Sequence, residues 1–256
     1  LFSSSSIGFM ANSVLPARLG EFVRAYVIGR KEQISKSTAF ATIVVARIFD
    51  GMTILMFLVF VLLRYSYDYP GWLQKISYVA FIFYFLALAF ILFLKLRSDQ
   101  ALKVVTFILK PFPEKIQSAV SRLVSSFING LGIIKSSRNI LGAFLFSILV
   151  WLPIVLIIYI LARSFGIDLS IIGALLLLAI YTFGMMIPSA PGFVGNIQYF
   201  SVVGLSIFGV SRATALGFSI VYHLCTFLPI TIVGFVFLFI EGYTLMELRK
   251  SASRTS

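Results

Sequence analysis

Long runs of apolar residues without a single charged side chain dominate the chain. Residues 76–94 form a run of 19, residues 139–162 one of 24, residues 169–211 one of 43 and residues 213–240 one of 28. A membrane-spanning helix needs roughly 20 consecutive apolar residues. The pattern therefore predicts several spanning helices, because only helices and closed barrels satisfy their backbone polar groups inside lipid.

The same pattern gives approximate bounds for the individual elements. Helices are predicted over 38–63, 76–96, 139–162, 171–187 and 214–240, and Pro153 is expected to kink the third of these. Segment 188–210 is also apolar, but two prolines and several glycines interrupt it. We expect a broken or re-entrant element there instead of an ordinary span.

A hydrophilic and basic section, 97–138, separates the two apolar halves. Within it, apolar residues of segment 114–134 recur at alternating spacings of three and four, which predicts an amphipathic helix. Such a helix could lie in the headgroup plane of an anionic leaflet, or pack against the bundle as a linker. Both interpretations stay open, and the section is expected to be a cytoplasmic connector.

Two stretches of the chain resemble each other. Pro16 precedes Gly20 by four residues, as Pro191 precedes Gly195, and each pair is followed by a similar helix, "TAFATIVVAR" or "TALGFSIVYH". We interpret this as an internal repeat of about 10–63 and 188–240 whose broken helices line a substrate path. The residues expected to shape the breaks are Pro16, Gly20, Pro188, Pro191, Gly192 and Gly195. Whether the repeats are parallel or inverted is left open, because it depends on the number of crossings between them.

Composition agrees with a membrane protein. The chain has 256 residues, 60% hydrophobic and 12% charged, with a mean hydropathy of +1.03, whereas soluble domains are about 25% charged. The predicted fold is therefore all-α: a polytopic transmembrane bundle, residues 1–256 forming one domain with two broken or re-entrant helix repeats. Because the chain opens with Leu1 inside an apolar segment, we expect its native beginning to lie upstream.

The net charge of +12 comes from lysines and arginines in short hydrophilic stretches. These gather in 18–36 and 95–138, which we place in the cytoplasm by the positive-inside rule. We therefore attribute the positive charge to cytoplasmic loops and do not expect the protein to bind nucleic acid. With one histidine and one cysteine in the chain, we expect no Cys/His metal site, no cofactor and no intrachain disulfide.

Charged residues near the first break form a candidate binding site. Arg47 and Asp50 are three residues apart inside a predicted spanning helix, so they share one face and can pair. Ionisable groups at membrane depth are costly and usually face a cavity or a partner, although a pair that only locks helix packing is the alternative. With Arg18, Glu21 and Arg24 they would make a cluster of three cations and two anions, which suits a phosphate headgroup.

The second break offers uncharged polar groups. His223 occupies the repeat position that matches Arg47, and it is expected either to serve packing or to take part in function. Asn196 and Gln198 follow Gly195 and need hydrogen-bonding partners at that depth. No catalytic constellation is present in the sequence, so we do not expect an enzyme.

The first block, "NSVLPARLGEFVRAYVIGR…ISKSTAFATIVVARIFDG", resembles the signature of the lysylphosphatidylglycerol synthase transmembrane region family, also called flippase-like domain proteins. The matching residues are Asn12, Leu15, Pro16, Arg18, Gly20, Glu21, Arg24, Arg47 and Asp50. The stretch "IPSAPGFVGNIQYF" resembles the family's P-x-x-P-G-G-x-G-x-x-E segment. It departs from that segment at Phe193, which replaces a glycine, and at Gln198, where many members carry a glutamate.

The resemblance implies lipid translocation. The family contains the membrane half of bifunctional aminoacyl-phosphatidylglycerol synthases, which moves the lysylated lipid between leaflets, and many stand-alone members. We therefore expect a multi-pass protein of the cytoplasmic membrane that moves a phospholipid or lipid-linked headgroup. Substrate-binding residues would be Asn12, Arg18, Glu21, Arg24, Arg47, Asp50, Asn196, Gln198 and His223.

In this hypothesis Arg18, Arg24 and Arg47 receive the phosphate, while Glu21 and Asp50 orient the arginines or bind a cationic headgroup. Two alternatives stay open. The chain could be the membrane module of a phosphatidylglycerol lysyltransferase whose catalytic domain lies outside it, or a scaffold that holds a lipid-modifying enzyme as its partner.

Overall fold

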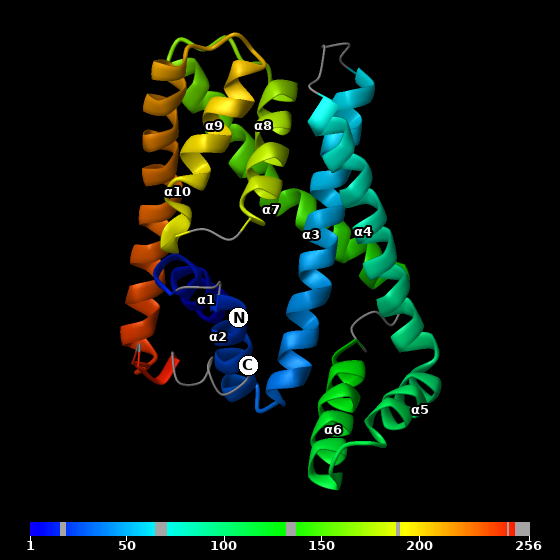
Figure 1. Cartoon of the computed structure of the whole chain (residues 1–256). Helices are drawn as coiled ribbons and strands as arrows, with labels where there is room; N and C mark the ends of the chain where they lie inside the picture. Colours follow the sequence, from blue (N-terminus) through cyan, green and yellow to red (C-terminus); the bar gives the residue numbers. More distant parts are fainter. Residues whose placement is uncertain (16–18, 65–70, 132–136, 188–189, 245, 249–256) are drawn as a thin grey trace.

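The computed structural model describes residues 1–15, 19–64, 71–131, 137–187, 190–244 and 246–248 (Figure 1). These residues form helices and no strand, which confirms the predicted all-α class. The helices are α1 (Phe2–Val14), α2 (Gly20–Lys31), α3 (Lys36–Arg64), α4 (Gly71–Leu96), α5 (Ser98–Leu109), α6 (Glu114–Gly130), α7 (Ser137–Ser164), α8 (Ile171–Gly184), the short 3-10 helix η3 (Pro191–Phe193), α9 (Asn196–Ser206) and α10 (Arg212–Ile240). Pro16, Arg18 and Pro188 lie outside the described residues.

Three of these helices are long and apolar enough to cross a membrane: α3, α10 and residues Arg138–Ser164 of α7. A fourth span results if Tyr78–Leu94 and Ser98–Leu109, which meet at a bend of 93°, count as one broken unit. All five helices predicted from the apolar pattern are present. The helix of α7 continues through Pro153.

The sequence pattern does not separate out α2 or α5. Both are 12 residues long and mix charged with apolar positions, so neither produces the extended apolar run that identified the five predicted long apolar helices. The predicted break near Pro16 and Gly20 corresponds to the end of α1 and the start of α2, although part of the connection lies outside the described residues.

Helices α1 and α2 form an antiparallel hairpin. The backbone N–H of Gly20 donates to Asn12 Oδ1 at 2.8 Å near the tip, and Lys31 Nζ donates to Ser3 Oγ at 3.0 Å near the open end. At about 1.5 Å per residue, helices of 13 and 12 residues are about 20 and 18 Å long, which is too short to cross a hydrocarbon core of about 30 Å. The pair therefore has the geometry of a re-entrant hairpin, with both outer ends on one side.

Helices α8 and α9 form a second antiparallel hairpin. Near its tip, Asn196 Nδ2 donates to the carbonyl of Gly184 at 3.2 Å, and further along the hairpin Tyr181 and Ser201 share a hydroxyl–hydroxyl hydrogen bond of 2.6 Å. With 14 and 11 residues, these helices are also too short to span the membrane singly. Within the interrupted apolar segment, η3 lies at the tip of this hairpin and α9 forms its second arm.

The two hairpins approach each other tip to tip. They enter from opposite ends of the molecule, and the helices that follow them, α3 and α10, run in opposite directions (Figure 1). A Cβ placed on Gly192 in η3 would lie 3.4 Å from the backbone carbonyl oxygen of Ser13 in α1, so the tips are in contact. Both following helices are 29 residues long.

The starts of α3 and α10 are capped in the same way. Ser35 Oγ accepts a hydrogen bond from the backbone N–H of Thr38 at 3.0 Å, and Ser211 Oγ accepts one from Thr214 at 3.2 Å. This satisfies a backbone donor that the first turn of a helix would otherwise leave free. The two units thus share the order of their elements, the length of the long helix and the serine cap at its start.

Buried apolar residues fix the hairpins against the long helices. The largest core cluster joins α3, α7, α8, α9 and α10, and a second joins α1 and α2 to the end of α10. Helix α1 crosses α10 closely at Gly234, where a Cβ would lie 2.1 Å from the Cβ of Met10. Such small residues at crossings are typical of membrane helices, because lipid gives no hydrophobic force between helices and close packing must replace it.

The amphipathic helix α6 packs on the bundle. Phe127 packs against the core cluster of α3, α4 and α7, and the hydroxyl of Thr38 donates to the carbonyl of Ser126 at 3.0 Å. Helix α6 therefore makes the contacts with the bundle that a packed linker would make. The end of α2, the start of α3, and helices α5 and α6 lie at the same end of the molecule (Figure 1).

Replacing Gly20 with alanine is expected to loosen the first hairpin. A Cβ there would lie 2.1 Å from the backbone oxygen of Gly8 and 2.4 Å from Asn12 Oδ1, so α1 itself must shift. Overpacking of this kind costs about 1–3 kcal/mol. Thermal unfolding in detergent should show a lower midpoint for Gly20→Ala.

The matched control is Gly142→Ala in α7, where no atom lies within 4 Å of the new methyl group. We expect this variant to unfold at or slightly above the wild-type temperature, because alanine favours helix more than glycine does. Equal destabilisation by the two substitutions would contradict the close crossing at Gly20.

Candidate functional site

Arg47 forms the centre of a charged cluster between the first hairpin and α3. Its Nη2 lies 3.0 Å from Glu21 Oε1 on α2, and its Nη1 lies 3.2 Å from Asp50 Oδ2 one turn further along α3. The three side chains are between 22% and 36% exposed, so the cluster is only partly shielded. One arginine therefore engages both carboxylates of the predicted site.

Further hydrogen bonds hold the two carboxylates. The hydroxyl of Ser147 on α7 donates to Asp50 Oδ1 at 2.8 Å, and Asn12 Nδ2 lies 3.5 Å from Glu21 Oε1. The same Asn12 side chain caps α2 through its oxygen. Ser147 was not among the predicted site residues. The signal in the sequence is its position as a polar residue within an uncharged apolar run, where its hydroxyl needs a partner at membrane depth.

Arg24 stands next to this cluster without a carboxylate of its own. Its guanidinium lies 5.9 Å from the ring centre of Phe9, and that of Arg47 lies 5.5 Å from the same ring. Among the described residues, no carboxylate lies within 4.0 Å of Arg24. The Nε atoms of both arginines are buried and have no hydrogen-bond partner in the described part of the chain.

This arrangement can bind an anion. A buried guanidinium nitrogen without a partner is unfavourable, and a phosphate or carboxylate oxygen would satisfy it. Phe9 positions both arginines by cation–π contact, so the two planar forks converge on one region. No pattern in the sequence identified Phe9, because it is one of 27 phenylalanines.

A second group of polar side chains, His223 and Gln198, holds the tip of the second hairpin. His223 Nε2 lies 2.8 Å from the carbonyl oxygen of Gly192, and Nδ1 lies 3.2 Å from Gln198 Nε2. Since a carbonyl can only accept, Nε2 donates and Nδ1 accepts from the amide of Gln198. The amide oxygen of Gln198 accepts in turn from the backbone N–H of Gly195 at 2.8 Å. The group is thus a chain of neutral hydrogen bonds.

Asn196 is also used to hold the backbone at this tip. Its Nδ2 donates to the carbonyls of Gly184 and Ile187, at 3.2 and 3.1 Å, where α8 has ended. Gly192, Phe193 and Gly195 have positive φ angles of 71°, 60° and 90°. Phe193 therefore adopts a conformation that favours glycine, at the position where the family pattern has one.

The structure does not merge the two groups into one cluster. Within the described residues, no hydrogen bond or ion pair joins His223, Gln198 or Asn196 to Arg47 and its carboxylates. Each group lies between one hairpin and the long helix that follows it, and the two hairpin tips meet through Ser13 and Gly192. His223 nevertheless occupies the place on α10 that Arg47 occupies on α3, twelve residues after the capping serine. Its hydrogen bonds favour a role in holding the backbone.

His223→Phe is expected to destabilise the second hairpin tip. The phenyl ring would stay aromatic and could keep the edge-on contact with Phe227, but the buried carbonyl of Gly192 would lose its donor. An unsatisfied buried acceptor costs about 1–3 kcal/mol, which thermal unfolding in detergent would report. Cys225→Ala, at an exposed position on the same helix, is the control and should unfold like the wild type. An unchanged midpoint for His223→Phe would show that His223 does not hold the tip.

Comparison with known proteins places these features in a family. The sequence profile of the lysylphosphatidylglycerol synthase TM region matches residues 1–234. A UPF0104 membrane protein of Methanothermobacter thermautotrophicus is 25% identical over 246 residues, covering 91% of this chain and 73% of the relative. Two UPF0104 membrane proteins of Methanocaldococcus jannaschii are each 23% identical and cover 90% and 92% of this chain, and 71% and 96% of their own lengths.

No solved structure matches the chain. The relatives are named only as membrane proteins, which agrees with the several apolar helices found here. The chain is a multi-pass membrane protein that belongs to the lysylphosphatidylglycerol synthase transmembrane region family.

Proposed function

We propose that this protein moves an anionic or aminoacylated phospholipid, or a lipid-linked headgroup, between the leaflets of the cytoplasmic membrane. The observation that carries the proposal is the partly buried Arg24, which lies beside Arg47 and has no carboxylate partner among the described residues. A phosphate bound there would contact two converging guanidinium groups. Its hydrocarbon chains would stay in the bilayer while the headgroup crosses.

The charges of the cluster fit such a headgroup. Arg47 is held in place by Glu21 and Asp50, whereas Arg24 keeps its charge available. The carboxylates are only partly exposed, but they lie close enough to contact a cationic amine on the same headgroup, as in a lysylated lipid. Arg18, the third cation predicted for this site, lies outside the described residues.

The depth of the cluster supports a role in crossing. Arg47 lies 11 residues after the first residue of α3, which corresponds to about 16 Å along the helix, or half of a hydrocarbon core of about 30 Å. His223 lies equally far into α10. Charged residues near the midplane are costly and usually mark the path of a substrate.

The arrangement of the two units supports the same function. We propose that segments 10–63 and 188–240, each a hairpin arm or tip followed by a long helix, are inverted repeats whose tips meet near the midplane. Transport proteins with inverted repeats place their substrate sites where broken helices meet, and alternate access by moving one repeat against the other. The contact between Ser13 and Gly192 is the junction at which such movement would occur.

The family description names the membrane region of a synthase, which keeps one alternative in view: a membrane module for a phosphatidylglycerol lysyltransferase. In that case an aminoacyl-transfer domain, on this protein or on a partner, would supply the lipid. Synthesis and translocation would then be consecutive steps, and the headgroup site described here would bind the aminoacylated lipid that the transfer domain releases.

Arg24→Gln is expected to slow lipid translocation at least ten-fold. A hydrogen bond to a charged group contributes about 1.5–3 kcal/mol, and each 1.4 kcal/mol changes a binding constant ten-fold. The measurement uses proteoliposomes with fluorescent phosphatidylglycerol, lysylphosphatidylglycerol or phosphatidylcholine and a quencher added outside. The control is Arg122→Gln, which changes an exposed arginine on α6 away from the cluster and should leave the rate unchanged.

Two outcomes would contradict the proposal. One is translocation at the wild-type rate by Arg24→Gln, which would instead favour a scaffold that holds a lipid-modifying enzyme. The other is the absence of translocation by the wild-type protein for every anionic lipid tested.

A further inference from the structure

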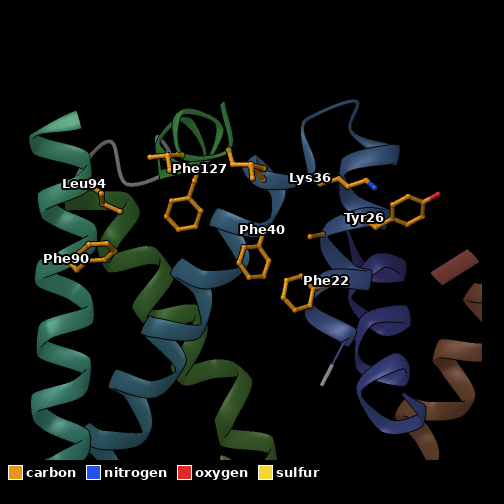
Figure 2. A pocket seen from close by; sticks show the side chains of 11 residues that line it. Phe22, Tyr26, Lys36, Phe40, Phe90, Leu94 and Phe127 are labelled. Atoms are coloured by element: carbon orange, nitrogen blue, oxygen red, sulfur yellow. The ribbon is translucent and has the colours of Figure 1, made fainter. Parts of the chain in front are cut away.

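An apolar pocket of about 430 Å³ lies beside the first hairpin, away from the contact between the two hairpin tips. Four helices contribute its walls, and Figure 2 shows them around the space: α2 with Phe22 and Tyr26, α3 with Phe40, α4 with Phe90 and Leu94, and α6 with Phe127. Sequence analysis expected a cavity faced by both repeats. This pocket is a separate feature, at the place where the amphipathic helix α6 meets the first repeat.

The lining of this pocket suits a hydrocarbon chain. Ligand pockets commonly measure about 300–1,000 Å³ and are lined mainly by apolar and aromatic side chains. Phe22 and Phe40 stack with ring centres 5.1 Å apart and nearly parallel planes, which joins the α2 wall to the α3 wall. Phe90 on the opposite wall is 60% exposed, so the pocket opens towards the surface of α4 that faces lipid.

A cation stands at the rim of the pocket. Lys36 is exposed at the start of α3, and its Nζ lies 4.7 Å from the ring centre of Tyr26. Among the described residues no carboxylate lies within 4.0 Å of Lys36. The neighbouring Lys31 is different, because it contacts the carboxylate of Glu241 and donates to Ser3. Lys36 is therefore free to bind an anion at the basic end of the bundle.

The pocket and the charged cluster lie on one face of α3. Lys36, Phe40 and Arg47 are separated by four and seven residues, spacings that bring side chains to the same side of a helix. The distance along α3 from Lys36 to Arg47 is about 16 Å at about 1.5 Å per residue. The face of α3 that carries Lys36 and Phe40 at the pocket therefore also carries Arg47 of the charged cluster.

From this geometry we infer that the pocket is a loading site for an anionic phospholipid. One acyl chain occupies the apolar space between α2, α3, α4 and α6, and the phosphate binds Lys36. The headgroup then follows the shared face of α3 to Arg24 and Arg47. This last step rests on the proposed function, whereas binding at the pocket does not depend on it.

The test uses the full chain in lipid nanodiscs that contain phosphatidylglycerol or phosphatidylcholine with a photoreactive diazirine on the same acyl chain. Labelled peptides are located by mass spectrometry. We expect phosphatidylglycerol to label the peptides around Phe40 and Phe127 about five-fold more than phosphatidylcholine does, which is the upper range for one exposed ion pair. Lys36→Gln should bring this ratio to about one.

Two further variants complete the design. Lys110→Gln removes an exposed lysine of the basic section outside the pocket, and it should leave the five-fold preference intact. Ser37→Trp places a large ring in the pocket lining, so it should lower labelling of these peptides by both lipids. Equal labelling by the two lipids in the wild type, or a preference that survives Lys36→Gln, would overturn the inference.

Translocation measured on the same variants separates the two proposals. Labelling that prefers phosphatidylglycerol and depends on Lys36, in a protein that translocates no lipid, supports the pocket and contradicts the translocase. Translocation that depends on Arg24, without preferential labelling at the pocket, supports the translocase and overturns the loading site.

Discussion

The backbone at membrane depth must satisfy its own hydrogen bonds, and the rest of this structure depends on how two interrupted hairpins do so. Lipid offers no donor or acceptor, so every N–H and C=O freed at a hairpin tip needs a protein partner. At the first tip, Asn12 accepts from the backbone of Gly20. At the second, Asn196 and His223 donate to carbonyls of Gly184 and Gly192. Polar side chains in these apolar segments are thus required by the breaks themselves.

The same constraint separates structural polar residues from those available to a substrate. At the second tip the amide and imidazole groups are occupied by backbone and by one another. In the charged cluster, Arg47 is occupied by two carboxylates, whereas Arg24 contacts the ring of Phe9 and has no carboxylate within 4.0 Å in the described part of the chain. The two units therefore share their architecture and differ in chemistry. A charged site lies beside one tip, and a neutral hydrogen-bonded chain closes the other.

The pocket adds a feature that neither repeat would have alone. It exists because α6 packs across the start of α3 and closes a space between α2 and α4. An apolar volume with the exposed Lys36 at its rim complements a phospholipid, whose hydrocarbon and phosphate are joined. Placed on the same face of α3 as Arg47, it would bring that lipid to the cluster without exposing its chains to water.

Apolar run lengths determined the all-α class and the long helices, because the cost of placing charge or unpaired backbone in lipid leaves few alternatives. Prolines and glycines indicated where the breaks fall. The spacing of Arg47 and Asp50 also determined that they share a face. Only the tertiary structure decided that the short segments fold back as opposed hairpins, since their direction depends on contacts between distant residues such as Ser13 and Gly192. The tertiary structure also decided that Arg47 and not Arg24 pairs with the carboxylates, and it added Phe9 and Ser147 to the site. These residues come from different helices, and sequence spacing carries no information about packing between helices.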